Sequence, residues 1–178
     1  MLDSQDQVRF EQLVLPHLDA AFNLARWLLR SREGAEDAAQ EAMLRSYKFF
    51  PSFRGGDARA WLLQIVRNTC YSWLEKNSRE GNMTEEFDEE FHGPATPTPE
   101  QAAIASQDRA RLSRALESLS PRSREVLVLR ELEGCSYKEI AVITSIPIGT
   151  VMSSLSRARR QLVSALVNLA HEETNREM

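Results

Sequence analysis

The chain has 178 residues, 42 % of them hydrophobic, and a formal net charge of −4, which suits one domain or two small ones with real cores. No apolar run approaches the ~20 residues of a membrane span, and the N-terminus lacks a signal-peptide pattern, so we expect a cytoplasmic protein. Seven glycines and seven prolines are too few for a β-rich or disordered chain, and helical periodicity recurs in most segments. We therefore expect an all-α fold.

The N-terminal part predicts two helices followed by a break. Residues from about Asp6 to Leu15 predict a short helix, and Pro16 is expected to open the next one. The second helix should bury one apolar stripe, made of Leu18, Ala21, Phe22, Ala25, Leu28 and Leu29. A polar break from Ser31 to Ala35, which contains Gly34, is expected to follow.

The segment from about Glu36 to Phe50 predicts a third helix with two unlike faces. One face suits a core and consists of Ala39, Ala42, Met43, Ser46 and Phe50. The other face mixes charges with one apolar residue and consists of Asp37, Gln40, Glu41, Leu44 and Lys48. Leu44 would serve as an anchor if this face docks on a basic partner helix. The alternative is a solvated face that carries one isolated leucine.

A long helix is predicted from Ala58 to about Asn77, with Asp57 as its N-cap after the loop Pro51–Gly56. Its inward face consists of Ala58, Trp61, Leu62, Ile65, Val66, Thr69 and Trp73. Its outer face and flanks carry Gln64, Arg67, Asn68, Tyr71, Ser72, Glu75 and Lys76. This surface fits single-stranded nucleic acid, because bases stack on rings, amides bond to base edges and cations bind phosphates. The alternative is an ordinary polar helix surface.

An acidic segment divides the chain. Between Glu80 and Glu100 there are seven acidic residues and no lysine or arginine, and leaving them out changes the net charge from −4 to +3. Its acidity and prolines predict an extended, poorly ordered linker over residues 80–101. The two helical units would then be residues 1–79 and 102–170, and a polar, frayed tail would cover 171–178.

The C-terminal part predicts two helices before its most informative stretch. A helix from about Ala102 to Leu119 would bury Leu112, Leu116 and Leu119. Ser120 and Pro121 would cap and open another helix, which stops at Gly134.

Residues Ser136 to Leu162 predict a helix-turn-helix. Ser136 and Glu139 fit a capping box at the start of a short helix, and Pro147 would open the second helix. An apolar stripe recurs at helical spacing along the second helix: Val151, Leu155, Ala158 and Leu162. Arginines on the opposite face could contact phosphates and base edges. The alternative is an ordinary helical hairpin with a solvated arginine face.

Residues for enzymatic or metal chemistry are not grouped in this sequence. Cys70 and Cys135 lie far apart, with no second thiol or histidine at metal-ligand spacing, so we expect reduced thiols; a redox role is the alternative. His17, His92 and His171 are isolated. Without a nucleophile–base pair, a metal cluster or a phosphate-binding glycine loop, we expect no enzyme, no metal and no cofactor.

Three segments resemble, in order, those of a bacterial ECF (extracytoplasmic function) sigma factor of the sigma-70 family. Residues 35–53, AEDAAQEAMLRSYKFFPSF, are similar to the helix that binds the clamp of the RNA polymerase β′ subunit. Residues 53–77, FRGGDARAWLLQIVRNTCYSWLEKN, are similar to the segment that melts and reads the promoter minus-ten element. Residues 116–162 are similar to the domain that reads the minus-thirty-five element, and the likeness covers nearly the whole chain outside the linker and tail.

The resemblance implies roles at the matching positions. Contacts with the polymerase clamp would come from Asp37, Gln40, Glu41, Leu44 and Arg45. Contacts with the minus-ten element would come from Phe53, Arg54, Asp57, Arg67, Asn68, Tyr71, Ser72 and Lys76. Asn68 matches a position that contacts a flipped-out base, and the loop Phe53–Asp57 matches the pocket for that base. Contacts with the minus-thirty-five element would come from Thr150, Met152, Ser153, Ser156, Arg157, Arg159 and Arg160.

The resemblance also implies partners. The chain would bind the β′ clamp and the β flap of core RNA polymerase, bind promoter DNA, and be controlled by an anti-sigma factor. The acidic linker matches the segment that threads toward the active centre and the RNA-exit path, and the free chain is expected to be a monomer. The alternative is a stand-alone helix-turn-helix transcriptional regulator, which would bind duplex DNA unaided as a dimer.

The recognition helix departs from the pattern of the family. Many relatives read GTVKSRLHRAR, or close to it, whereas this chain reads GTVMSSLSRAR from residue 149 to residue 159. Met152 and Ser154 stand where cations are common, and Ser156 stands where an aromatic residue or histidine is often found. Fewer cations predict weaker phosphate anchoring and a shallower salt dependence, so the sequence preference cannot be carried over.

Overall fold

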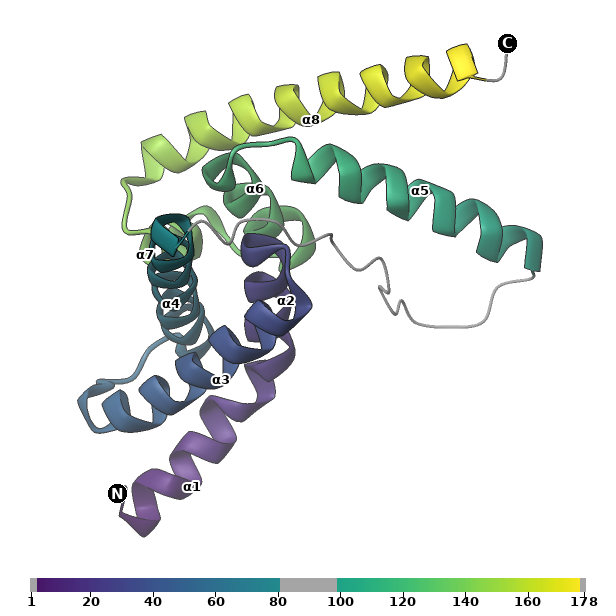
Figure 1. The fold of residues 1–178 in the computed structure, drawn as a ribbon. Coiled ribbons are helices and arrows are strands. Elements are labelled where there is room, and N and C mark those ends of the chain that lie inside the picture. The colour runs from purple at the N-terminus through teal and green to yellow at the C-terminus, as the bar shows by residue number, and fades with distance from the viewer. Residues whose placement is uncertain (1–2, 81–98, 177–178) are drawn as a thin grey trace.

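A computed structural model describes residues 3–80 and 99–176, and these residues form helices and short connections without a β-strand (Figure 1). The elements in order are α1 (Ser4–Leu13), the 3-10 turn η1 (Leu15–His17), α2 (Leu18–Leu29), α3 (Arg32–Phe49), the 3-10 turn η2 (Phe50–Ser52), α4 (Ala58–Glu80), α5 (Pro99–Glu117), α6 (Pro121–Leu127), the π-helical turn η3 (Val128–Leu132), α7 (Tyr137–Thr144) and α8 (Ile148–Arg176). The predicted all-α fold is confirmed. Most of the predicted linker, residues 81–98, lies outside the described residues.

Elements α1 to α4 form the N-terminal unit, in which α2, α3 and α4 pack against one another. The buried face of α3 consists mainly of small residues, since Ala35, Ala38 and Ala42 are buried in the same cluster as the larger Leu24 and Leu62. Asp57 caps α4 as predicted, because its carboxylate accepts the backbone N–H of Ala60 at 3.0 Å. No single described helix is long and apolar enough to span a membrane; only α7 and α8 taken together, across a 100° bend, meet those criteria.

Three sequence predictions in the N-terminal unit are wrong. Pro16 lies within η1 instead of opening α2, and Leu18, the first residue of α2, is 44 % exposed instead of buried. The polar break from Ser31 to Ala35 is also wrong, because α3 already begins at Arg32, with Ser31 as its N-cap. The Ser31 hydroxyl accepts the N–H of Gly34 at 3.0 Å, so this glycine lies in the first turn of a helix.

Close packing accounts for Gly34. A Cβ atom at this position would lie 2.9 Å from Cζ2 of Trp73 in α4 and 3.3 Å from the Ser31 hydroxyl. We expect Gly34→Ala to lower the free energy of unfolding by about 1 kcal/mol, since overpacking outweighs the better helix propensity of alanine. Gly149→Ala is the matched control, because a Cβ there meets no atom within 4 Å, and it should stabilise the protein slightly. Urea unfolding measures the free energy of unfolding of both variants. Equal stabilisation by the two substitutions would contradict the packing role of Gly34.

Elements α5 to α8 form the C-terminal unit, whose local signals match the prediction. Ser136 and Glu139 make both hydrogen bonds of a capping box at α7. Ser120 caps α6, and Gly134 adopts a left-handed φ of 65° where the preceding helical segment ends. The predicted stripe is buried at Val151, Leu155 and Ala158. Pro147 differs from the prediction by one residue, because it lies directly before α8 instead of at its first position, and its carbonyl accepts the N–H groups of Thr150 and Val151.

The ends of this unit are more helical than predicted. Helix α5 begins at Pro99, inside the predicted linker, and α8 continues to Arg176, through most of the predicted frayed tail. An ion pair links the end of α8 to α5, because Arg111 donates to Glu173 at 2.5 Å. This long-range pair is invisible to a local composition argument, which explains the wrong prediction for residues 171–176.

The two units pack on each other in this structure. Helix α4 lies against α7, and α2 lies against α6 (Figure 1). Buried apolar side chains of both units, such as Leu63 and Ile140, belong to one contiguous cluster. The sequence predicts two separate helical units and does not predict this contact between them.

Candidate nucleic-acid and partner interfaces

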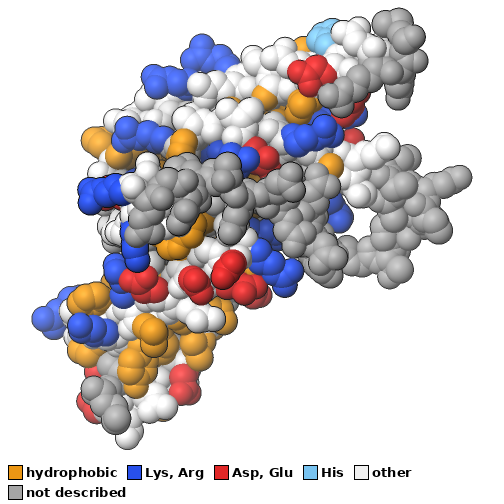
Figure 2. All heavy atoms as spheres, viewed as in Figure 1, with side chains coloured by type: hydrophobic (Ala, Val, Ile, Leu, Met, Phe, Trp, Pro, Cys, Tyr) orange, Lys and Arg blue, Asp and Glu red, His pale blue; other side chains and the backbone are white. Residues whose placement is uncertain are grey.

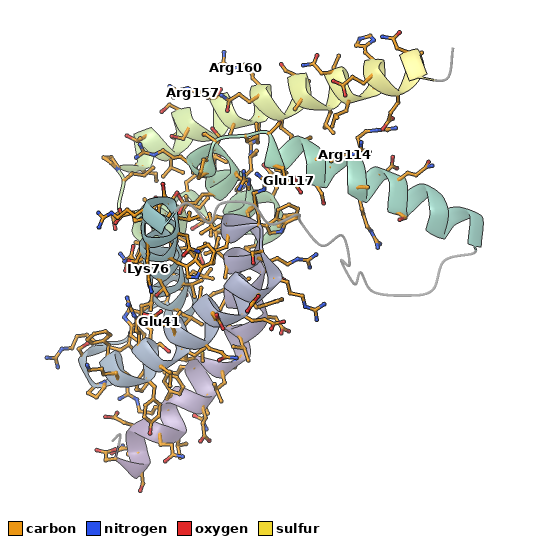
Figure 3. All side chains as sticks on the ribbon, in the orientation of Figure 1. Glu41, Lys76, Arg114, Glu117, Arg157 and Arg160 are labelled. Carbon is orange, nitrogen blue, oxygen red and sulfur yellow. The ribbon has the colours of Figure 1, made fainter. Side chains whose placement is uncertain are left out.

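The predicted clamp-binding residues lie together on the outer face of α3. Asp37, Gln40, Glu41 and Leu44 are exposed, and Arg45 is half-buried and donates to Glu41 at 2.5 Å. Glu41 marks this face in Figure 3. Leu44 is 72 % exposed, so no described part of the chain covers most of this leucine.

Phe49, which the sequence analysis did not select, is half-exposed at the end of α3, whereas its neighbour Phe50 is buried. The ammonium group of Lys48 lies 5.9 Å from the Phe49 ring. No sequence signal separated the two phenylalanines, because consecutive residues of a helix can both be buried, as Leu62 and Leu63 are in α4.

A cavity of about 410 Å³ lies beside the loop that was predicted to hold a flipped base. Loop residues Phe53, Arg54 and Asp57 line it together with Trp61 and Gln64 of α4. The Phe53 ring is buried and lies 5.0 Å from the Trp61 ring, which gives the cavity an aromatic wall.

The loop that carries this cavity needs glycine. Gly55 and Gly56 have φ values of 91° and 95°, a region that favours glycine. The far side of the cavity is formed by Lys138, Glu139 and Val142 of α7, so the C-terminal unit contributes to its wall.

The structure separates the remaining predicted minus-ten residues into two groups. Asn68, Ser72 and Lys76 are exposed on α4, with Lys76 labelled in Figure 3. Arg67 and Tyr71 are partly covered, and the Arg67 guanidinium lies 4.5 Å from the centre of the Tyr71 ring.

The side chain that covers them is Glu125 of α6. Arg67 Nε donates to one carboxylate oxygen at 2.6 Å, and the Tyr71 hydroxyl donates to the other at 3.1 Å. The sequence analysis missed Glu125, although a glutamate directly before the apolar run Val126–Leu129 was a signal of a buried, paired charge.

Burial and pairing act in opposite directions on these groups. Burial raises the pKa of the Glu125 carboxyl, while the charge and hydrogen bond of Arg67 and the hydrogen bond of Tyr71 favour its ionised form. Burial, followed by the charge of Glu125, raises the pKa of Tyr71 to about 12. The phenol therefore stays protonated at neutral pH and can donate its hydrogen bond.

The predicted minus-thirty-five residues lie on the exposed side of the first turns of α8: Thr150, Met152, Ser153, Ser156, Arg157, Arg159 and Arg160. Basic side chains gather over this part of α8 in Figure 2. Arg159 makes two hydrogen bonds to Glu131, at 3.0 and 2.7 Å.

Arg157 and Arg160 line a groove of about 620 Å³ that also contacts Arg114 and the α5–α6 connection. The structure thus presents a polar and basic face that nothing in the C-terminal unit covers.

Cys70 and Cys135 are both buried, and they do not form a disulfide with each other. Burial raises the pKa of Cys70 to about 12 and that of Cys135 to about 11. Both therefore remain protonated at neutral pH, which gives no support for the redox alternative. Among the described residues, no group of three histidine, cysteine, aspartate or glutamate side chains could hold a metal ion. His92 lies outside the described residues.

Comparisons with known proteins match both units. The family description sigma-70 region 2 matches residues 13–80, and sigma-70 region 4 matches residues 109–162. The chain is 33 % identical over 175 residues to the RNA polymerase sigma-H factor of Pseudomonas aeruginosa, covering 94 % of this chain and 91 % of that protein. It is 32 % identical over 165 residues to the ECF RNA polymerase sigma-E factor of Escherichia coli K12, covering 88 % and 86 % respectively.

Two solved structures share the fold. The sigma factor RpoE from Bartonella quintana, solved in complex with the anti-sigma factor NepR, has a TM-score of 0.74 at 30 % identity, covering 89 % of this chain and 96 % of that one. CnrH, solved in complex with the cytosolic domain of CnrY, has a TM-score of 0.63 at 26 % identity, covering 92 % and 90 %. With both units matched and full-length relatives above 30 % identity, the chain belongs to the sigma-70 family as an ECF sigma factor.

Proposed function

We propose that this ECF sigma factor binds core RNA polymerase and directs it to promoters that carry a minus-ten and a minus-thirty-five element. One observation carries the proposal: the regions matched to sigma-70 regions 2 and 4 coincide with the two helical units, and each unit presents an exposed polar surface at the predicted positions. The α3 face would bind the β′ clamp, and the C-terminal unit would bind the β flap.

The cavity beside the loop Phe53–Asp57 fits the capture of one extruded base. Extruding a base costs a few kcal/mol, so an aromatic wall formed before binding reduces the reorganisation that capture requires. Asn68 is exposed on α4, the helix that also lines this cavity, and its amide can both donate hydrogen bonds to a base edge and accept them from it. Within the C-terminal unit, the exposed face of α8 would read the upstream element as a duplex.

Control by an anti-sigma factor is the second part of the proposal. Its support is that the RpoE and CnrH structures, which share this fold, were each solved with a protein bound, one of them named as an anti-sigma factor. The chain would act in the cytoplasm as a transcription initiation factor and would contribute no catalytic group of its own.

Association with core polymerase tests the proposal. The purified chain should co-elute with core RNA polymerase as a one-to-one complex in gel filtration. A chain that fails to co-elute, and instead binds duplex DNA unaided as a dimer, would be the stand-alone regulator.

A further inference from the structure

The three ion pairs described between the two units share one charge polarity. Arg30, Arg59 and Arg67 come from the N-terminal unit, and each pairs with a glutamate of the C-terminal unit. The three glutamates are Glu117 at 3.1 Å, Glu133 at 3.2 Å and Glu125 at 2.6 Å. The C-terminal unit therefore presents carboxylates to a cationic surface of the N-terminal unit, as a phosphate backbone would.

Glu125 is the most buried of these carboxylates, with a side chain only 1 % exposed. Its two oxygens accept hydrogen bonds from Arg67 and Tyr71, which are both predicted to contact promoter DNA. A carboxylate and a phosphate accept the same charge-assisted hydrogen bonds, so the two acceptors exclude each other at these donors.

The neighbouring residue fixes the direction of Glu125. Arg124 is buried, and its guanidinium donates to three carbonyl groups at the end of α5 and in the turn that follows, at 2.9 to 3.0 Å. It also donates across the contact to the carbonyl of Trp27 in α2, at 3.2 Å. These bonds tie the start of α6 to the N-terminal unit and hold Glu125 against α4.

We propose that Glu125 is an intramolecular competitor of promoter DNA, which occupies Arg67 and Tyr71 while the two units are in contact and releases them when the units part. The inference rests on the proposed role of α4 in binding the minus-ten strand. The ion pairs add little net strength to this contact, because the cost of removing paired charges from water offsets much of their attraction. Parting the units must therefore expose mainly the apolar side chains between them, such as Leu63 and Ile140. By contrast, the predicted minus-thirty-five residues on α8 lie outside this contact, and the one carboxylate described on them, Glu131 at Arg159, belongs to the same unit.

Single-strand binding without polymerase tests the competitor. The probe is a fluorescein-labelled single-stranded DNA 12-mer of mixed sequence, and fluorescence anisotropy gives its Kd for the full chain. Glu125→Gln should lower the Kd about fivefold, because a neutral amide competes weakly for Arg67. The matched control is Glu173→Gln, which removes a glutamate whose ion pairs to Arg111 and Arg114 lie within the C-terminal unit. It should leave the Kd unchanged.

Reversing the charges of an ion pair that is not at the DNA surface distinguishes separation of the two units from an effect confined to the surroundings of Glu125. Glu117→Arg opposes Arg30, so it should part the units and lower the Kd, and Arg30→Glu added to it should restore the wild-type value. If the wild type, Glu125→Gln and Glu117→Arg all bind the DNA with equal Kd, then Glu125 is not a competitor, but the role of α4 in binding DNA stands. No binding by any variant at low salt would instead overturn the role of α4 in binding DNA, and the inference with it.

Discussion

Replacing Leu44 with aspartate is expected to weaken binding of core RNA polymerase about 30-fold or more. An exposed apolar anchor that becomes buried in an interface is typically worth about 2 kcal/mol, and a carboxylate at that position would also have to lose its water. Because Leu44 is 72 % exposed in the free chain, the substitution should lower the free energy of unfolding by less than about 1 kcal/mol, the difference in helix propensity. Titration of labelled protein with core polymerase measures the Kd.

Val8→Asp is the matched control for Leu44. Val8 is 50 % exposed on α1, a helix to which no partner is assigned, so the same change of chemistry there should leave the affinity for polymerase within about twofold. Equal affinities for the Leu44 and Val8 variants would remove α3 from the polymerase interface.

Replacing Asn68 with alanine is expected to reduce open-complex formation about tenfold while core binding stays unchanged. The side-chain amide can make a paired donor and acceptor contact with a base edge, and such a contact is worth about 1–3 kcal/mol. Asn68 is exposed, and its only described side-chain contact is a 3.4 Å hydrogen bond from Arg67, so little folding energy should be lost. Permanganate footprinting of the melted strand, at saturating sigma factor, measures the effect.

A second asparagine provides the control for Asn68. Asn175 is exposed near the end of α8, and Asn175→Ala removes the same amide from a position far from the proposed DNA surfaces. Loss of polymerase binding in parallel with open complexes in the Asn68 variant would show a structural role instead of contact with a base.

Local sequence chemistry predicted the helix-turn-helix and the start of α4. The capping box of Ser136, the αL stop at Gly134 and the N-cap at Asp57 each depend on residues within one helical turn. Such signals can be read without knowing the fold. Gly34 shows the limit of this reasoning, because its small size serves the contact with Trp73 in another helix instead of a turn.

The contact between the units could not be predicted in the same way. Glu125 and Arg67 are 58 residues apart, and helical periodicity reports which face of a helix is buried but not against what. The sequence placed Arg67 and Tyr71 on a surface for nucleic acid, and the structure shows the same donors satisfied by a carboxylate. The sequence therefore predicted what Arg67 and Tyr71 can bind, whereas their acceptor in the free chain, Glu125, depended on tertiary structure.

In vitro transcription with core RNA polymerase on genomic fragments tests the central claim most directly. We expect RNA only when the chain and core polymerase are both present, from start sites that share two upstream sequence elements. If the chain adds no transcript to those made by core polymerase alone on the whole set of fragments, then it does not direct initiation and the account is wrong.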